Sequence, residues 1–216
     1  MLILASNSPR RKQLMTLGAW KYKIVSADVD ERLVPGESPR DYVLRLAESK
    51  ARAVVSEIEP GAVVIAADTT VVDGSDILGK PVDEKDAEAM LRRLRGRTHQ
   101  VFTALAALRV ADDTLLTDWC CTDVPMRNYS DEEMMAYIDT GDPLDKAGSY
   151  AIQYAGFKPV EDLQGCYANV VGLPLCHLTR TLIKLDVTPQ ADIPQVCQAT
   201  LQYQCPIHWQ VLGEAG

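Results

Sequence analysis

No stretch of the sequence approaches the roughly 18 consecutive apolar residues that a membrane-spanning helix needs. The apolar run at residues 2–5 is also too short for the core of a signal peptide. Basic residues are in the minority, since 22 Lys and Arg stand against 30 Asp and Glu, which gives a net charge of −8. This balance argues against nucleic acid or an anionic membrane as the main partner. We therefore expect a cytoplasmic protein with neither kind of partner.

Several short motifs are missing as well. The six cysteines form no CxxC pair and no regular framework, so we expect buried reduced thiols rather than disulfides or zinc ligands. The glycine-rich patterns GxxxxGK[ST] and GxGxxG are absent, which excludes a P-loop and a dinucleotide fingerprint. Without Cys/His spacing or a Ser/His pair, nucleophilic acyl chemistry has little support.

What is present is an alternation of strand and helix signals. At 216 residues and 47% hydrophobic content, the chain can bury one core or two small lobes around a cleft. The continuous apolar run at 62–67 is typical of a strand covered on both faces, which predicts an α/β fold with a parallel or mixed sheet. Strands are expected at 2–5, 22–26 and 62–72, as a hairpin at 98–110 and 115–126, and as a short strand after residue 153. Helices are expected at 9–17, 39–54 and 84–94, after the capping box at 130–133, and last after Pro174.

The chain opens with MLILASNSPRR, which predicts a strand, a polar turn and a helix N-terminus capped by Ser8. Three consecutive cations, beginning with Arg10 and Arg11, then fall in the first helical turn, where the helix dipole favours anions. A bound anion would resolve this conflict. The hydroxyls of Ser6 and Ser8 and the two guanidiniums could hold a polyphosphate, although the cations could also extend into water.

Further polar residues stand where local packing does not explain them. Lys50 lies on the apolar stripe of its helix, so it either reaches along that face to solvent or enters a polar cleft. Asp68 interrupts the buried strand towards its carboxyl end, and such an acid is normally paired, hydrogen-bonded or metal-bound, unless it caps a turn. Lys80 stands in a rigid turn, and the polar segment 141–153 adds Lys146 and Gln153. A group of cations around one acid suits a displacement reaction at phosphorus, because the cations offset charge on the phosphoryl oxygens while the carboxylate holds a divalent metal or orients water. The amide of Gln153 could form hydrogen bonds with the edge of a nucleotide base.

Seven separated motifs give the chain a resemblance to the Maf family of nucleoside triphosphate pyrophosphatases over residues 2–185. They are SNSPRR, ESKAR, AADT, GKP, THQVFT, DKAGSYAIQ and NVVGLPL. The resemblance implies an elongated mixed central sheet flanked by helices, with two lobes and a cleft, similar to the inosine triphosphate pyrophosphatases. It also implies cleavage of a nucleoside triphosphate to the monophosphate and pyrophosphate, a divalent cation such as Mg²⁺ or Mn²⁺, and a homodimer.

The resemblance also assigns roles to individual residues. Asp68 is similar to the family's proton acceptor or metal-associated base. The residues that match substrate-sorting positions are Arg10, Thr69 and Gln153, and they resemble the branch that acts on dTTP and UTP. Further cleft positions are matched by Glu31, Lys50 and Lys80, and Glu31 is expected beside Asp68 at the metal.

Two alternatives stay open at this point. The enzyme could act on modified nucleotides such as 7-methyl-GTP, or the protein could be a nucleotide-binding regulator of cell division with little turnover. The chain departs from the family pattern at Tyr154 and Ala155, which follow the glutamine where glycine is usual. The tail at 186–216 has no counterpart in the family, and we expect an extension with at most short ordered pieces.

Overall fold

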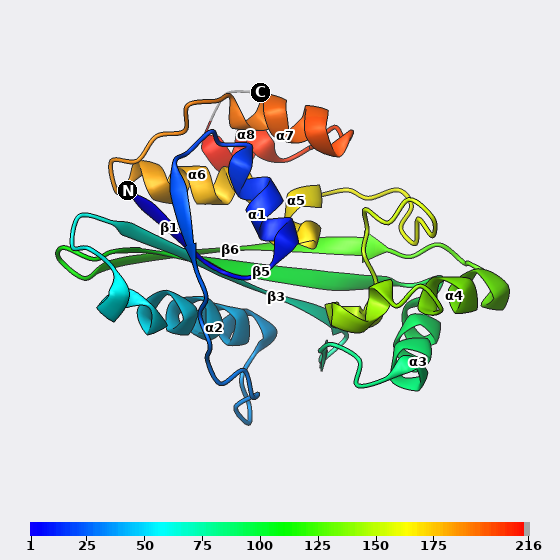
Figure 1. The fold of residues 1–216 in the computed structure, drawn as a ribbon. Helices are drawn as coiled ribbons and strands as arrows, with labels where there is room; N and C mark the ends of the chain where they lie inside the picture. Colours follow the sequence, from blue (N-terminus) through cyan, green and yellow to red (C-terminus); the bar gives the residue numbers. More distant parts are fainter. Residues whose placement is uncertain (214–216) are drawn as a thin grey trace.

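A mixed sheet runs through the centre of the protein in the order β2-β1-β3-β5-β6, with β4 beside β3. The structure is a computed structural model that describes residues 1–213 (Figure 1). The strands are β1 (Leu2–Ala5), β2 (Tyr22–Val25), β3 (Val63–Asp73), β4 (Asp76–Leu78), β5 (Thr98–Arg109) and β6 (Thr114–Pro125). β1 is parallel to β2 and β3, and the other pairs are antiparallel. The prediction of a mixed sheet is confirmed.

One edge of β3 has two partner strands with a gap between them. β1 pairs with β3 as far as Ile65, opposite Leu4, and β4 takes up the edge again only at Val71. β5 covers the other edge through Val72 without a break. No strand of the described chain therefore pairs with residues 66–70 on the first edge, and we call this stretch the β3 gap. Asp68 lies in the middle of β3, so its expected place near the carboxyl end was wrong; the strand that ends here is β1.

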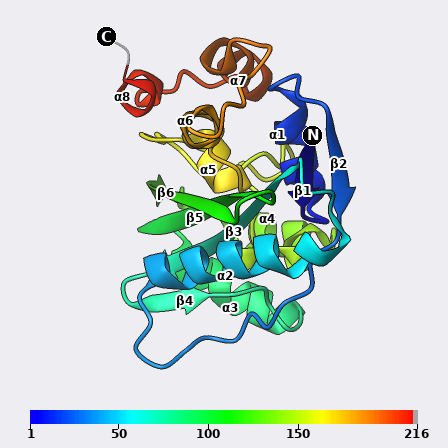
Figure 2. The same cartoon turned by 90° about the vertical axis from the view of Figure 1, so that its left-hand side faces the viewer.

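Helices cover both faces of the sheet. They are α1 (Pro9–Thr16), α2 (Pro39–Ala53), α3 (Glu84–Leu94), α4 (Asp131–Ile138), α5 (Tyr167–Val171), α6 (Leu175–Ile183), α7 (Ile193–Leu201) and α8 (His208–Leu212), with short 3-10 turns η1 (Val55–Glu57), η2 (Asp142–Asp145) and η3 (Ala147–Ser149). Figures 1 and 2 show α2 on one face and α5 and α6 on the other. The predicted caps at Ser8 and Ser130 are confirmed, because each accepts a backbone hydrogen bond at a helix start, and Ser38 and Asp83 cap α2 and α3 in the same way.

Three hydrophobic clusters make up the core. Ile65 and Leu178 belong to the cluster that joins the sheet to α6, and Val64 belongs to the cluster under α2, so successive residues of β3 face opposite layers. The third cluster joins the far ends of β3 and β5 to α3 and α4, with Leu91 and Tyr137 fully covered. The first two clusters lie on opposite faces of one end of the sheet, and the third lies at the other end. These two ends correspond to the two expected lobes, and the cavity described below lies between them.

The C-terminal part differs from the sequence prediction. The expected short strand after residue 153 is wrong, since an isolated bridge between Met126 and Val160 is what forms there. α6 is not the last helix, because α7 and α8 follow it. Proline usually interrupts a helix, yet Pro194 sits in the first turn of α7 after the cap Asp192, where a missing N–H costs nothing. Ile193 is 2% exposed, so this helix packs into the core.

The expected burial of the cysteines holds for three of the six, Cys120, Cys166 and Cys176, while Cys121, Cys197 and Cys205 are half-buried. All six cysteines lie in the described residues and no disulfide joins them. Within residues 1–213, no helix combines the length and the apolar character needed to cross a bilayer.

Candidate functional site

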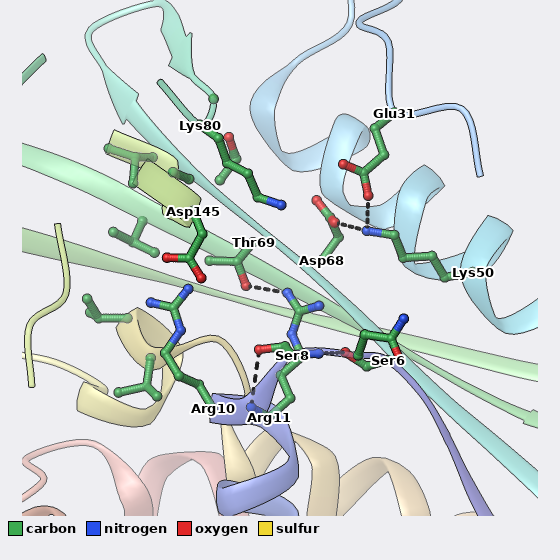
Figure 3. Close-up of a pocket in the computed structure, with 18 of the residues that line it drawn as sticks. Ser6, Ser8, Arg10, Arg11, Glu31, Lys50, Asp68, Thr69, Lys80 and Asp145 are labelled. Atoms are coloured by element: carbon green, nitrogen blue, oxygen red, sulfur yellow. Dashed lines mark hydrogen bonds and ion pairs between the residues drawn. The ribbon is translucent and has the colours of Figure 1, made fainter. Parts of the chain in front are cut away.

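A cavity of about 650 Å³ opens at the β3 gap. Its walls come from the β1–α1 turn, from α2, from β3 and from the segment around η2 and η3 (Figure 3). Most of the polar residues that the sequence singled out line it, namely Ser6, Ser8, Arg10, Arg11, Glu31, Lys50, Asp68, Thr69 and Lys80. The gap explains this convergence, because side chains on both faces of an unpaired strand edge can reach the same space.

The start of α1 supplies hydroxyl donors and one open cation. The Ser8 N–H donates to Ser6 Oγ at 3.2 Å, and the Arg11 N–H donates to Ser8 Oγ at 3.4 Å. Each hydroxyl oxygen accepts from the backbone, so each hydroxyl hydrogen can still donate to a ligand. The Arg10 guanidinium points into the cavity from below, and Lys80 enters from the opposite side (Figure 3). These groups suit an anion at the helix N-terminus.

Arg11 has a different role from Arg10, because its guanidinium forms hydrogen bonds within the protein. Its Nη2 donates to Thr69 Oγ1 at 3.0 Å and its Nε donates to the Gly172 carbonyl at 2.9 Å. Burial lowers the pKa of Arg11, while the nearby Asp68 charge opposes that shift. The guanidinium therefore ties α1 to β3 and to the residue after α5. These bonds use two of the five N–H donors of Arg11, which also lines the cavity, so its part in binding phosphate stays a prediction.

Lys50 forms the centre of the charged group. Its Nζ lies 2.5 Å from Asp68 Oδ1 and 2.6 Å from Glu31 Oε1, so the side chain enters the cleft instead of running out to solvent. Burial raises the pKa of Asp68, with Lys50 and Arg11 acting against that shift. Partial burial alone would raise the pKa of Glu31, but its hydrogen bond to Lys50 brings it below the usual value. Asp68 is thus a buried acid whose ionised form depends on its cationic neighbours.

Two predicted residues are not among the described residues that line the cavity. Lys146 Nζ turns to Asp145 Oδ1 at 2.6 Å and to Asp142 Oδ1 at 3.1 Å. Gln153 is exposed, on a turn held by the Tyr154 N–H bond to the Ala151 carbonyl. Gln153 is thus apart from the predicted group, whereas Lys146 stays beside the cavity through its contact with Asp145.

Sequence reasoning missed the neighbour of Lys146. Asp145 lines the cavity and faces Arg10 (Figure 3). The signal lay in the adjacent opposite charges of the DKAGSY motif, which allow either side chain to face the cleft. Partial burial would raise the pKa of Asp145, but the Lys146 bond and the Arg10 charge bring it below the usual value. The cavity therefore holds a third ionised acid beside its cations.

The remaining wall of the cavity is apolar. Val71, Val101, Tyr150, Val170 and Val171 line it, and the two last residues come from α5. A wall of this kind suits the sugar and base of a nucleotide, while the charged end suits phosphates. The family departures at 154 and 155 do not crowd this wall, because the Tyr154 ring packs on Tyr137 with centroids 5.0 Å apart.

The residue after α5 provides a first test of this geometry. Gly172 has φ of +119°, and an added Cβ would lie 3.3 Å from Thr69 Oγ1 and 3.6 Å from Arg11 Nε. We expect Gly172→Ala to raise the KM for a nucleotide about 10-fold and to lower stability by about 1 to 3 kcal/mol. Steady-state kinetics and thermal unfolding measure both effects. Gly141→Ala is the control, because Gly141 also has a positive φ but an added Cβ would meet nothing within 4 Å. This control should lose stability and keep the wild-type KM. If the two variants had the same KM, the role given to the Gly172 contacts would be contradicted.

The fold and the cavity together define a class, that of α/β proteins built to hold a phosphorylated ligand between cations and a buried acid. The chain belongs to the Maf family. The model of that family, described as Maf-like protein, matches residues 1–185.

Relatives and one solved structure show how far the likeness extends. A dTTP/UTP pyrophosphatase of Anaeromyxobacter dehalogenans is 49% identical over 84% of this chain and 92% of the relative. A dTTP/UTP pyrophosphatase of Hahella chejuensis is 46% identical over 88% of this chain and 95% of the relative. The solved structure is that of a dITP/XTP pyrophosphatase from Mycobacterium abscessus. It is 16% identical in sequence, the match covers 85% of this chain and 93% of that protein's chain, and the TM-score is 0.41.

Proposed function

We propose that this protein is a nucleoside triphosphate pyrophosphatase that hydrolyses dTTP and UTP to the monophosphate and pyrophosphate. The observation that carries the proposal is the contact of Asp68 with Lys50, 2.5 Å apart, in a cavity that also holds Arg10 and Lys80. Similar proteins that cover most of the chain are named dTTP/UTP pyrophosphatases, which supports this choice of substrates.

In this proposal, the two ends of the cavity bind the two ends of the nucleotide. The triphosphate lies at the start of α1, with donors from Ser6, Ser8 and Arg10 and with Lys80 opposite. The sugar and base lie along the apolar wall that Val170 and Val171 form from α5. Arg10 and Thr69 both line the cavity, which supports the proposal that they sort substrates; Gln153 is left out of the proposed binding set.

Asp68 is the proposed general base. Its carboxylate takes a proton from water as the water oxygen attacks the α-phosphorus, and the bond from that phosphorus to the bridging oxygen breaks. Pyrophosphate leaves with the bridging oxygen, and the monophosphate gains the water oxygen. Lys50 keeps Asp68 ionised in its buried position, and the cations at the start of α1 offset the charge that grows on the phosphoryl oxygens.

The residues present fit a divalent metal. Carboxylate oxygens of Asp68 and Glu31 both contact one cationic atom, Lys50 Nζ, and this arrangement supports a positive charge shared between the two acids. Mg²⁺ and Mn²⁺ prefer oxygen ligands, and Mg²⁺ sites commonly combine one or two carboxylates with substrate phosphates. We propose that Asp68 and Glu31 hold such an ion, which when bound offsets negative charge on the triphosphate.

The remaining sequence predictions stay part of this proposal. Residues 1–185 form the proposed pyrophosphatase domain, and 186–216 the extension. The proposal also keeps the homodimer and the cytoplasmic location, and it includes no nucleic acid or membrane partner, in line with the net charge of −8.

A nucleotide panel tests the proposal. The full-length protein is incubated with Mg²⁺ or Mn²⁺ and with dTTP, UTP, 7-methyl-GTP and the other common triphosphates, and pyrophosphate and orthophosphate are measured separately. We expect pyrophosphate, with dTTP and UTP turned over at least about 10-fold faster than the rest. Orthophosphate as the product would contradict the reaction, and preference for 7-methyl-GTP would contradict the substrate. Tight binding with no product at high protein concentration would favour the regulator.

A further inference from the structure

The C-terminal extension packs beside the helix that forms the nucleoside wall. α7 contacts α5 and α6, and α8 contacts α6, all on the face of the sheet opposite α2 (Figure 2). Ile193 shares a hydrophobic cluster with Leu178, so α7 contributes to the core on this face. The family match ends at residue 185, so α5 and α6 belong to the matched region, whereas α7 and α8 lie beyond it.

One side chain of the extension holds the turn that precedes α5. The Gly165 N–H donates to Tyr203 Oη at 3.1 Å. The Tyr203 hydroxyl lies 3.0 Å from the Leu163 carbonyl and 2.9 Å from the Gly165 carbonyl, and its one hydrogen is shared between these two acceptors. Its ring lies 5.6 Å from the Tyr167 ring in the first turn of α5. A single hydroxyl therefore satisfies backbone groups on both sides of the turn.

This turn fixes the start of α5. Cys166 follows it directly and is the N-cap of the helix, with its Sγ accepting from the Asn169 N–H at 3.4 Å. The Asn169 side chain then donates to the Val101 carbonyl at 3.0 Å and to Thr122 Oγ1 at 2.9 Å. Since α5 has only five residues, its place depends on these end contacts more than on its own helical bonds.

The other end of α5 reaches the site through two hydrogen-bonded routes. The Gly172 carbonyl accepts from Arg11 Nε, and Arg11 Nη2 donates to Thr69 Oγ1. Separately, Thr103 Oγ1 donates to the Asn169 carbonyl at 2.9 Å and lies 2.9 Å from Thr69 Oγ1. A displacement of α5 would therefore move the wall and disturb the contacts of Thr69 together.

We propose that Tyr203 is a positioning residue for nucleotide binding. Its hydroxyl holds the turn at 163–165, the turn holds α5, and α5 presents Val170 and Val171 to the nucleoside and supports Arg11. The inference rests on the proposed function, because it assigns the α5 wall to the nucleotide. Asp68 and Lys50 make no hydrogen bond within this chain of contacts, which ends at Thr69 beside Asp68, so we expect loss of the Tyr203 hydroxyl to weaken binding more than the proton transfer.

Full-length Tyr203→Phe tests the proposal, because the variant keeps the ring and loses the hydroxyl alone. We expect the KM for dTTP to rise about 3- to 10-fold with kcat within about twofold of the wild-type value. Tyr129→Phe is the matched control, since its buried hydroxyl donates to the Leu91 carbonyl at 2.7 Å and lines no part of the cavity. The control should lower the unfolding temperature without moving KM.

A reciprocal measurement covers the case in which Tyr203→Phe fails to fold. By linkage, a nucleotide that needs α5 in place must also stabilise the turn that holds it. Hydrogen exchange of the Gly165 amide in the wild-type protein should slow when the α,β-imido analogue of dTTP binds. An unchanged KM in a folded variant, or unchanged exchange with the analogue bound, would overturn the inference alone. No nucleotide turnover by the wild-type protein would overturn the proposed function, and the inference with it.

Discussion

Asp68→Asn is expected to lower the kcat for pyrophosphate release from dTTP by about 1,000-fold, within the range for loss of a general base. Asparagine has nearly the same shape, so the variant can still fill the β3 gap, but its amide cannot take the proton of the attacking water. The substitution also removes the charge that faces Lys50 Nζ at 2.5 Å. Single-turnover measurements with saturating dTTP report the chemical step without interference from weaker binding.

Asp73→Asn is the matched control for this experiment. Asp73 is also a buried acid on β3, 6% exposed, but it pairs with Arg93 and Arg97 and does not line the cavity. This control should lose stability and keep kcat within about threefold of wild type, because it changes a structural ion pair far from the reacting atoms. If folded Asp68→Asn turned over dTTP at a near-normal rate, Asp68 would have no central part in the chemistry.

Lys50→Met is expected to lower kcat/KM at pH 7 by about 100-fold. Methionine fills much of the lysine stem's volume, yet it leaves Asp68 and Glu31 without the cation that both contact. Burial already raises the pKa of Asp68, and Lys50 opposes that rise. Without Lys50 the pKa of Asp68 must rise further. Because the base acts as a carboxylate, the acidic limb of the kcat/KM profile should move to higher pH.

Glu31→Gln is the control that separates the effect of Lys50 on the pKa of Asp68 from the effect of changing any charge in the cavity. It also breaks a contact of Lys50, but Glu31 is 53% exposed and Asp68 keeps its partner. Its loss of activity should be several-fold smaller than that of Lys50→Met, and the acidic limb should stay close to that of wild type. A Lys50→Met profile whose acidic limb did not move would show that Lys50 does not control the ionisation of Asp68.

Local sequence signals predicted the elements that carry the site. The apolar run and cap at the start of the chain produced β1 and the Ser8 cap of α1, and the spacing of three and four placed Lys50 on the inner side of α2. An acid inside a buried strand was identified for the same reason, because Asp68 breaks a pattern that burial otherwise explains. These inferences depend on a few neighbouring residues, which is why one sequence was enough.

The parts that went unpredicted depend on contacts distant in the sequence. Nothing near Arg11 indicates that Gly172, 161 residues away, accepts from its guanidinium. Adjacent Asp145 and Lys146 both fit a polar turn, and only the packing of η2 and η3 decides that the acid faces the cavity. α7 was missed because the tail carries three prolines, at 189, 194 and 206, which favour loops, although Pro194 lies in the first turn of that helix.

The β3 gap has a consequence for self-association. An uncovered strand edge offers backbone groups to any extended chain that approaches it, and long open edges promote aggregation. Here β1 and β4 limit the open stretch to residues 66–70. Lys50 and Lys80 stand over that stretch beside Asp68, and desolvating these charges would oppose the docking of a foreign strand. The ionic groups that make the cavity polar therefore also protect the sheet from unwanted pairing.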